Sequence, residues 1–326
     1  MPPLLQPPPD PVVAFGPVPS RRLGRSLGID HLPPKSCTYA CVYCQLGPTL
    51  AMRATRREFY PPDAVVAAVE RRVADLRRRG ERIDVLTFVP AGEPTLDRHL
   101  GHLIRGLRPL GLPVAVISNA SLVWQDEVRA DLAEADWVSL KVDTVDPAVW
   151  RALDRPHGLL DLDRVLGGIR AFARAFGGTL VTETMLVAGT NDDDAGLAAI
   201  ADYLAEVAPR TAYLAVPTRP PAVPTVRPPD ADAVVRAVQL LRERLPAVEC
   251  LLGYEGNAFA ASGNAEADLL GITAVHPLRE DAALDLLARC GADGVVLVRL
   301  VDAGELVASD YRGHTYYLRR LRRPDA

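Results

Sequence analysis

The sequence predicts an α/β fold, a partial (β/α)6 barrel followed by a small α+β region at the C-terminus. Short apolar runs alternate with amphipathic stretches of helical period between residues 27 and 245. Strands that alternate with helices in this way build a parallel sheet, and about six such units leave a barrel partly open. The last sixty residues change character and predict helices followed by a hairpin, which indicates a separate unit.

Each element follows from this pattern in chain order. Strands are expected near 27–29 and at 85–89, 114–118, 137–142, 180–186 and 212–216, with helices at 63–79, 96–107, 125–133, 162–175, 192–206 and 230–245. The C-terminal region predicts helices at 279–289 and 293–303, then a hairpin of 306–311 and 314–318 that turns at Arg312-Gly313. Two helices followed by such a hairpin resemble a winged-helix module.

The same patterns divide the chain into four parts. Residues 1–19 hold eight prolines and are expected to form an extended, poorly ordered arm. The barrel is expected over 20–250, a linker over 251–264 and the winged-helix-like domain over 265–326. A basic run closes the chain, so a nucleic acid is a candidate substrate for the C-terminal region, and a protein is the other candidate.

Composition excludes several classes of protein. No run of eighteen apolar residues is present, so no membrane partner is expected, and the proline-rich N-terminus lacks the charge of a signal peptide. The net charge of −4 gives no overall attraction to nucleic acid. Five cysteines, three of them clustered, argue against a disulfide scaffold and for a reducing, cytoplasmic location.

The clustered cysteines are Cys37, Cys41 and Cys44, spaced C-x3-C-x2-C. Three thiolates on one short loop can converge on one soft metal centre. A structural zinc knuckle is the alternative, but it usually needs four ligands, and the next cysteine is Cys250 while the nearest histidine is His31. The spacing therefore favours an iron–sulfur cluster with one iron that lacks a protein ligand.

This motif, with Tyr43 just before its last cysteine, resembles the signature of the radical S-adenosylmethionine (SAM) superfamily. The resemblance implies an enzyme with a [4Fe-4S] cluster held by Cys37, Cys41 and Cys44, whose open iron is chelated by SAM. One electron from the cluster would then cleave SAM to a 5′-deoxyadenosyl radical. The resemblance also implies a reductant such as flavodoxin or ferredoxin as a partner.

Ligands of such barrels gather at the carboxyl ends of the strands. After the second strand, Pro90-Ala91-Gly92-Glu93-Pro94 resembles the Gly-Gly-Glu motif of the superfamily, with Ala91 in place of the first glycine. Glu93 is expected to accept a hydrogen bond from the ammonium of SAM. Ser118 and Asn119 suit ribose hydroxyls or a helix cap equally well. The expected SAM contacts are Tyr43, Ala91, Gly92, Glu93, Pro94, Ser118, Asn119 and Ser139.

Lys141 and Asp143 are the expected catalytic residues. Ser139, Lys141 and Asp143 alternate on one strand and therefore share a face, where buried polar groups need partners or a ligand. Of 37 basic residues only Lys35 and Lys141 are lysines, which indicates a need for a compact amine, although chance placement is an alternative. A structural Lys141–Asp143 pair is the other alternative.

The motifs further resemble the oxidoreductase branch related to wyosine (tRNA imidazoguanosine) synthases. Those enzymes hold a second cluster with cysteines that precede the motif, whereas no cysteine precedes Cys37 here. We therefore expect a one-cluster relative that modifies an unknown substrate, an RNA, a polypeptide or a small molecule. The alternative function is a non-catalytic iron–sulfur sensor that controls a nucleic-acid-binding winged helix.

Overall fold

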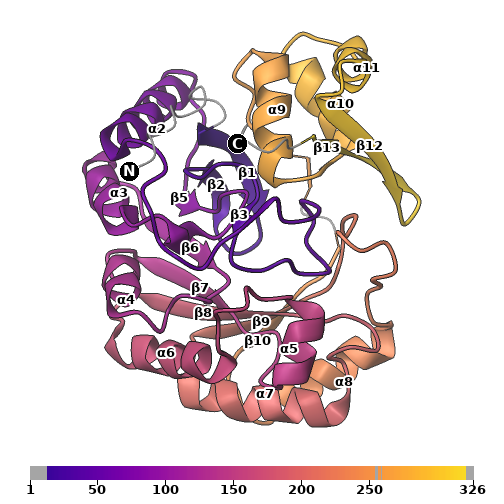
Figure 1. Cartoon of the computed structure of the whole chain (residues 1–326). Helices are drawn as coiled ribbons and strands as arrows, with labels where there is room; N and C mark the ends of the chain where they lie inside the picture. Colours follow the sequence, from indigo (N-terminus) through magenta and orange to yellow (C-terminus); the bar gives the residue numbers. More distant parts are fainter. Residues whose placement is uncertain (1–12, 254–255, 258, 321–326) are drawn as a thin grey trace.

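The computed structural model describes residues 13–253, 256–257 and 259–320, and its main element is a curled sheet of eight strands (Figure 1). In spatial order these are β1 (Ala14–Ser20), β2 (Gly24–Ile29), β5 (Val85–Phe88), β6 (Val114–Ser118), β7 (Trp137–Lys141), β8 (Thr179–Met185), β9 (Thr211–Ala215) and β10 (Val248–Leu251). Strand β1 runs antiparallel to β2, and all other neighbours are parallel. The expected partial barrel is confirmed.

Helices cover the outer face of this sheet (Figure 1). They are α2 (Pro62–Arg78), α3 (Leu100–Leu107), α4 (Asp126–Leu132), α6 (Leu162–Ala175), α7 (Asp194–Val207) and α8 (Ala231–Arg242). Helix α6 illustrates the amphipathic pattern by which the helices were expected. Asp161 caps its first turn by accepting from the Arg164 amide. Leu162, Val165 and Ile169 are buried on one face of the helix. Among the expected helices, the first residue of α3 differs most from expectation. The helix was expected to begin at residue 96, but it begins at Leu100, after a 3₁₀ turn over Pro94–Leu96.

Four elements of four or more residues were not expected from the sequence: β1, β10, α5 (Pro147–Leu153) and α9 (Ala265–Val275). Strand β1 corrects the expectation that the proline-rich arm is poorly ordered up to residue 19. It lies at the edge of the sheet, where prolines without an N–H group are tolerated. Phe15 packs on Gly28, where an added Cβ would come within 2.0 Å of the phenyl ring. Residues 1–12 of the arm lie outside the described residues.

The C-terminal region has its own hydrophobic core. Helices α9, α10 (Glu280–Arg289) and α11 (Val295–Asp302) pack on a sheet of order β11-β13-β12, formed by β11 (Leu278–Arg279), β12 (Leu306–Tyr311) and β13 (His314–Arg319). The expected hairpin and its two preceding helices are present, and α9 adds a third helix. The winged-helix assignment and the four-part division of the chain stay predictions.

A buried ion pair and an apolar cluster join the two regions. Arg72 of α2 lies 3.5 Å from Asp268 of α9, and both side chains are less than 5% exposed (4% and 2%). Arg72 also donates to the carbonyl of Gly16. Losing one partner of such a pair costs about 3–5 kcal/mol, because the other charge remains buried. Helix α9 is therefore held against β1, close to the mouth of the barrel.

Candidate active site

The three cysteines lie on a loop that crosses the carboxyl ends of β5, β6 and β7. The loop forms hydrogen bonds to the segments that follow these strands: Ser36 O accepts from the Glu93 amide, the Thr38 side-chain Oγ1 accepts from Asn119 Nδ2, and the Val42 amide donates to Leu153 O. All three cysteines are free and partly buried. The loop therefore presents its sulfurs at the end of the barrel where parallel-barrel enzymes hold their ligands.

Each sulfur has a different polar neighbour. Lys35 Nζ lies 3.0 Å from Cys44 Sγ, Asp154 Oδ1 lies 3.3 Å from Cys41 Sγ, and Asn119 Nδ2 lies 3.6 Å from Cys37 Sγ. Burial raises the pKa of the Cys37 thiol to about 12 and that of Cys41 above its usual range. Iron–sulfur clusters bind thiolates, so cluster binding must release these protons.

The donor set fits a cluster better than a single ion. Within the residues that the structure describes, no three His, Cys, Asp or Glu side chains are close enough to hold one metal ion. A four-iron cluster places each of its cysteine ligands on a different iron and needs no such convergence on one point. Soft thiolates are also the donors that such clusters select.

The turn after β5 packs directly on the cysteine loop. A Cβ added to Gly92 would come within 1.9 Å of Ser36 O, so glycine is required for this close approach. Ala91 is fully buried, and its carbonyl accepts from the Lys35 amide at 2.6 Å. Pro94 begins the 3₁₀ turn and is also buried. The turn and the loop therefore form one rigid unit.

Glu93 is almost completely buried and binds the neighbouring segments. Its Oε1 accepts from the amide and hydroxyl of Thr95 and from the Ser118 hydroxyl, at 3.0, 2.6 and 2.7 Å. Its Oε2 accepts from the Asn119 amide at 2.7 Å. Burial raises the pKa of Glu93, and these hydrogen bonds oppose that shift. Contact between Glu93 and SAM stays a prediction, as it does for Ser118 and Asn119.

Lys141 lies inside the barrel between two carboxylates. Its Nζ is 3.1 Å from Glu183 Oε1 and 3.7 Å from Asp143 Oδ1, and it lies over the Tyr43 ring, 5.0 Å from the centroid. Burial lowers the pKa of Lys141, but Asp143 and Glu183 outweigh this effect and hold it above its usual range. Both lysines of the chain thus lie at this site, and Lys141 is held as a cation rather than as a nucleophilic amine.

A second buried network links Tyr43, on the cysteine loop, to Asp143 and Asp154. The Tyr43 hydroxyl donates to Asp143 and lies 2.8 Å from Asp154 Oδ1, the same oxygen that faces Cys41. Burial raises the pKa of both carboxyl groups. Asp154 follows helix α5 and carries no sequence motif, so sequence reasoning missed it. Ser139 is buried on β7. The roles of Tyr43, Ser139 and Asp143 stay predictions.

A cavity of about 350 Å³, which we name the barrel cavity, lies beside these groups. Tyr43, Cys44 and Val89 line it near the cysteine loop, and Glu183 lines it deeper in the barrel, where Arg22 pairs with Glu183 at 2.5 Å. Val275 and His276, at the end of α9, line it from the C-terminal region. The C-terminal region therefore forms part of the wall of the site.

Two solved structures illustrate the likeness of the fold to known proteins. TYW1 with a lysine–pyruvate adduct bound has a TM-score of 0.53 at 15% identity, over 69% of this chain and 76% of that chain. SuiB of Streptococcus suis bound to S-adenosylmethionine has a TM-score of 0.51 at 15% identity, over 71% and 53% of the two chains. At such low identity the likeness shows the fold.

Sequence comparison identifies the family. Residues 32–204 match the model of the radical SAM superfamily. The UPF0026 protein MJ1312 of Methanocaldococcus jannaschii is 40% identical over 96% of this chain and 98% of that protein. A UPF0026 protein of Helicobacter pylori (strain J99) is 31% identical over 86% and 81%. The helices among the described residues are all too short or too polar to cross a membrane. The match to the family model and the likeness to the two UPF0026 proteins show that the chain belongs to the radical SAM superfamily and is a relative of the UPF0026 proteins.

Proposed function

We propose that this radical SAM enzyme binds one [4Fe-4S] cluster at Cys37, Cys41 and Cys44 and cleaves SAM to a 5′-deoxyadenosyl radical that modifies a substrate in the barrel cavity. Three free cysteines on one loop, packed against the Ala91-Gly92-Glu93 turn at the mouth of a parallel barrel, carry this proposal. The cluster and SAM are the cofactors of the superfamily, and a flavodoxin or ferredoxin is the proposed electron donor.

The residues of the chain have distinct roles in this proposal. When bound, the cluster supplies an electron and SAM supplies the sulfonium that the electron cleaves. Lys35 places its ammonium group 3.0 Å from Cys44 Sγ, beside one of the three proposed cluster ligands. Glu93 holds the segments after β5 and β6 in place through four hydrogen bonds. Lys141, Asp143 and Glu183 form a fixed group of charges inside the barrel, of which Glu183 lines the cavity.

A direct experiment tests this function. Protein reconstituted with iron and sulfide without oxygen is mixed with SAM and dithionite, and 5′-deoxyadenosine is measured by mass spectrometry. We expect 5′-deoxyadenosine to accumulate in proportion to the cluster content. A protein with a full cluster that binds SAM but yields no 5′-deoxyadenosine with dithionite or reduced flavodoxin would reject catalysis.

The second candidate is a sensor in which the cluster acts on the C-terminal region. Gln45, next to Cys44, donates to Val275 O at 3.3 Å and accepts from Arg219 at 3.0 Å, so a physical link exists. The charge of that region gives no support to nucleic-acid binding, because residues 265–326 hold ten carboxylates against eight arginines. Of the basic run at 319–323, residues 321–323 lie outside the described residues.

A further inference from the structure

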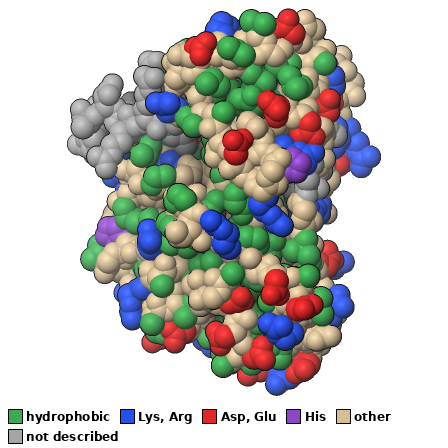
Figure 2. Space-filling model, turned by 90° about the vertical axis from the view of Figure 1, so that its right-hand side faces the viewer, with side chains coloured by type: hydrophobic (Ala, Val, Ile, Leu, Met, Phe, Trp, Pro, Cys, Tyr) green, Lys and Arg blue, Asp and Glu red, His purple; other side chains and the backbone are tan. Residues whose placement is uncertain are grey.

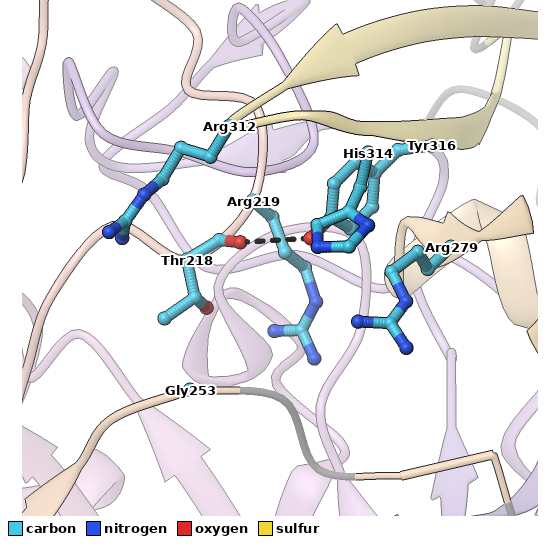
Figure 3. Close-up of a pocket in the computed structure, with 7 residues that line it drawn as sticks. All are labelled: Thr218, Arg219, Gly253, Arg279, Arg312, His314 and Tyr316. Atoms are coloured by element: carbon cyan, nitrogen blue, oxygen red, sulfur yellow. Dashed lines mark hydrogen bonds between the residues drawn. The ribbon is translucent and has the colours of Figure 1, made fainter.

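A second cavity, of about 310 Å³, lies at the waist between the barrel and the C-terminal region (Figure 3). We name it the waist cavity. It is lined by Thr218, Arg219, Gly253, Arg279, Arg312, His314 and Tyr316. Three of the seven are arginines and none is acidic. Figure 2 shows several Lys or Arg side chains across the middle of the molecule. The lining therefore favours an anion.

The hairpin of the C-terminal region is held over this cavity by two tyrosines. The Tyr311 hydroxyl donates to Pro217 O at 3.0 Å, and the Tyr316 hydroxyl donates to Thr218 O at 3.3 Å, as Figure 3 shows for Tyr316. Arg312 stands at the hairpin turn, between these two tyrosines in sequence. Because the hairpin is anchored on both sides of its turn, Arg312 is placed over the cavity with little further loss of freedom.

The other two arginines are held by neighbours. Arg219 donates to Gln45 Oε1 and to His276 Nε2, both at 3.0 Å and both neutral, since burial and then Arg219 lower the pKa of His276 well below its usual range. Arg279 forms a two-point contact with Asp281, which fixes its planar group and offsets part of its charge. In Figure 3 the guanidinium groups of Arg219 and Arg279 extend in the same direction.

The waist cavity adjoins the barrel cavity, because Thr218, Arg219 and Gly253 line both. A ligand held at the waist would therefore extend toward Cys44. Arginine forks match the oxygens of phosphate, and several around one space favour a doubly charged group. Residues 265–326 hold ten carboxylates against eight arginines, which argues against a long nucleic-acid backbone and for a single group.

We propose that the waist cavity binds the phosphate group of a small phosphorylated substrate, whose remaining part lies in the barrel cavity. This inference names the substrate class of the proposed enzyme and rests on that function. Arg312, Arg279 and Arg219 bind the phosphate oxygens, and the C-terminal region contributes two of the three.

Calorimetry on the cluster-loaded protein with SAM bound tests the proposal. The probes are inorganic pyrophosphate, ribose 5-phosphate and ribose. We expect the two phosphates to bind and ribose not to bind. Arg312→Gln should weaken phosphate binding by about tenfold or more, because a hydrogen bond to a charged group is lost. Arg299→Gln is the matched control, since Arg299 pairs with Glu266 on the surface of the same region.

Each outcome decides the proposal. The proposal is overturned if Arg312→Gln and Arg299→Gln weaken phosphate binding equally. It is also overturned if neither pyrophosphate nor ribose 5-phosphate binds at millimolar concentration. Binding of unfractionated tRNA with none of ribose 5-phosphate would replace the small substrate by RNA and would also overturn it. Production of 5′-deoxyadenosine is measured in parallel: if it persists without phosphate binding, only the substrate class is wrong, whereas its absence rejects the proposed function itself.

Discussion

The barrel cavity and the waist cavity differ in how their charged side chains are paired. In the barrel, Lys141 and Arg22 are matched by Glu183 and Asp143, and every one of these groups has a partner within the protein. At the waist, three of the seven lining residues in the described part of the chain are arginines and none is acidic, while Arg279 is paired with Asp281 beside the cavity. The first site is organised before any ligand arrives, whereas the lining of the second favours an anion.

This difference indicates that the two cavities have different roles, chemistry in the barrel and substrate binding at the waist. A balanced interior supplies fixed dipoles and charges for chemistry on a bound radical precursor, at low cost in reorganisation. The arginine-rich lining of the waist cavity attracts and binds the negatively charged end of a substrate. Arg219 lines both cavities and contacts Gln45, next to Cys44, so it connects the two. The predictions below test each side of this comparison.

The largest effect is expected from the cysteine ligands. Serine at Cys37, Cys41 or Cys44 should abolish the cluster, because a hydroxyl is a hard, weakly ionised ligand in place of a soft thiolate. Iron, sulfide and the visible absorption of the reconstituted protein provide the measurement. Serine at Cys250 or Cys290 is the control and should keep the full cluster. A full iron content in any of the three loop variants would refute the assignment of that ligand.

The next effect concerns Lys141. Lys141→Arg keeps the charge but replaces a compact ammonium between Glu183 and Asp143 with a larger planar group. We expect normal folding and cluster content but loss of most SAM cleavage or turnover. Lys35 is the other lysine, so Lys35→Arg provides a comparison at the cluster side of the site. If Lys141→Arg cleaves SAM and turns over at the parental rate, Lys141 has no special role.

A smaller effect is expected at Glu93. Glu93→Ala removes the acceptor for four hydrogen bonds, and losing one hydrogen bond to a charged group costs about 1.5–3 kcal/mol. Because the motif predicts that Glu93 also accepts from the ammonium of SAM, loss of that bond should lower SAM affinity roughly ten- to hundredfold with little change in iron content. Glu93→Gln keeps one oxygen acceptor and should lose less. Unchanged SAM affinity in the alanine variant, measured by calorimetry, would remove Glu93 from the site.

The barrel could be predicted from sequence because its strands and helices carry local periodic patterns. The apolar face of α6 and the cysteine spacing needed no knowledge of distant contacts. Strand β1 escaped prediction because proline content favours an irregular arm, while pairing with β2 and the Phe15–Gly28 contact decide its structure. Tertiary packing overrode the local signal there.

The residues of the site were predictable to different degrees. Lys141 and Asp143 were visible because their alternation on one strand leaves polar groups inside a barrel. Asp154 lies 113 residues from Cys41 in sequence, so only the fold reveals that it faces the sulfur. The waist cavity joins Arg219 to the hairpin of the C-terminal region in the same way. Contacts between distant segments leave no periodic trace in the sequence.

His276 at the joint between the two cavities gives the smallest expected effect. It is buried, and burial, reinforced by Arg219, lowers its pKa well below the usual value of 6.5. A histidine with a lowered folded pKa contributes stability that is present above pH 6.5 and is lost as the pH falls below that value. Each pH unit below 6.5 should therefore cost about 1.4 kcal/mol at this group.

Acidification from pH 7.5 to 5.5 should accordingly accelerate the opening of α9, which ends at His276, more than that of α6, seen as a larger fall in the protection factors of its amides against hydrogen exchange. His276→Gln keeps an oxygen acceptor for Arg219 but cannot take up a proton, so it should remove this part of the acid sensitivity. His102→Gln is the matched control, because His102 is exposed on α3 beside Asp63. If the His276→Gln protein shows the same acceleration as the parent, protonation of His276 does not loosen the joint, and carboxylates elsewhere in the protein account for the acid sensitivity.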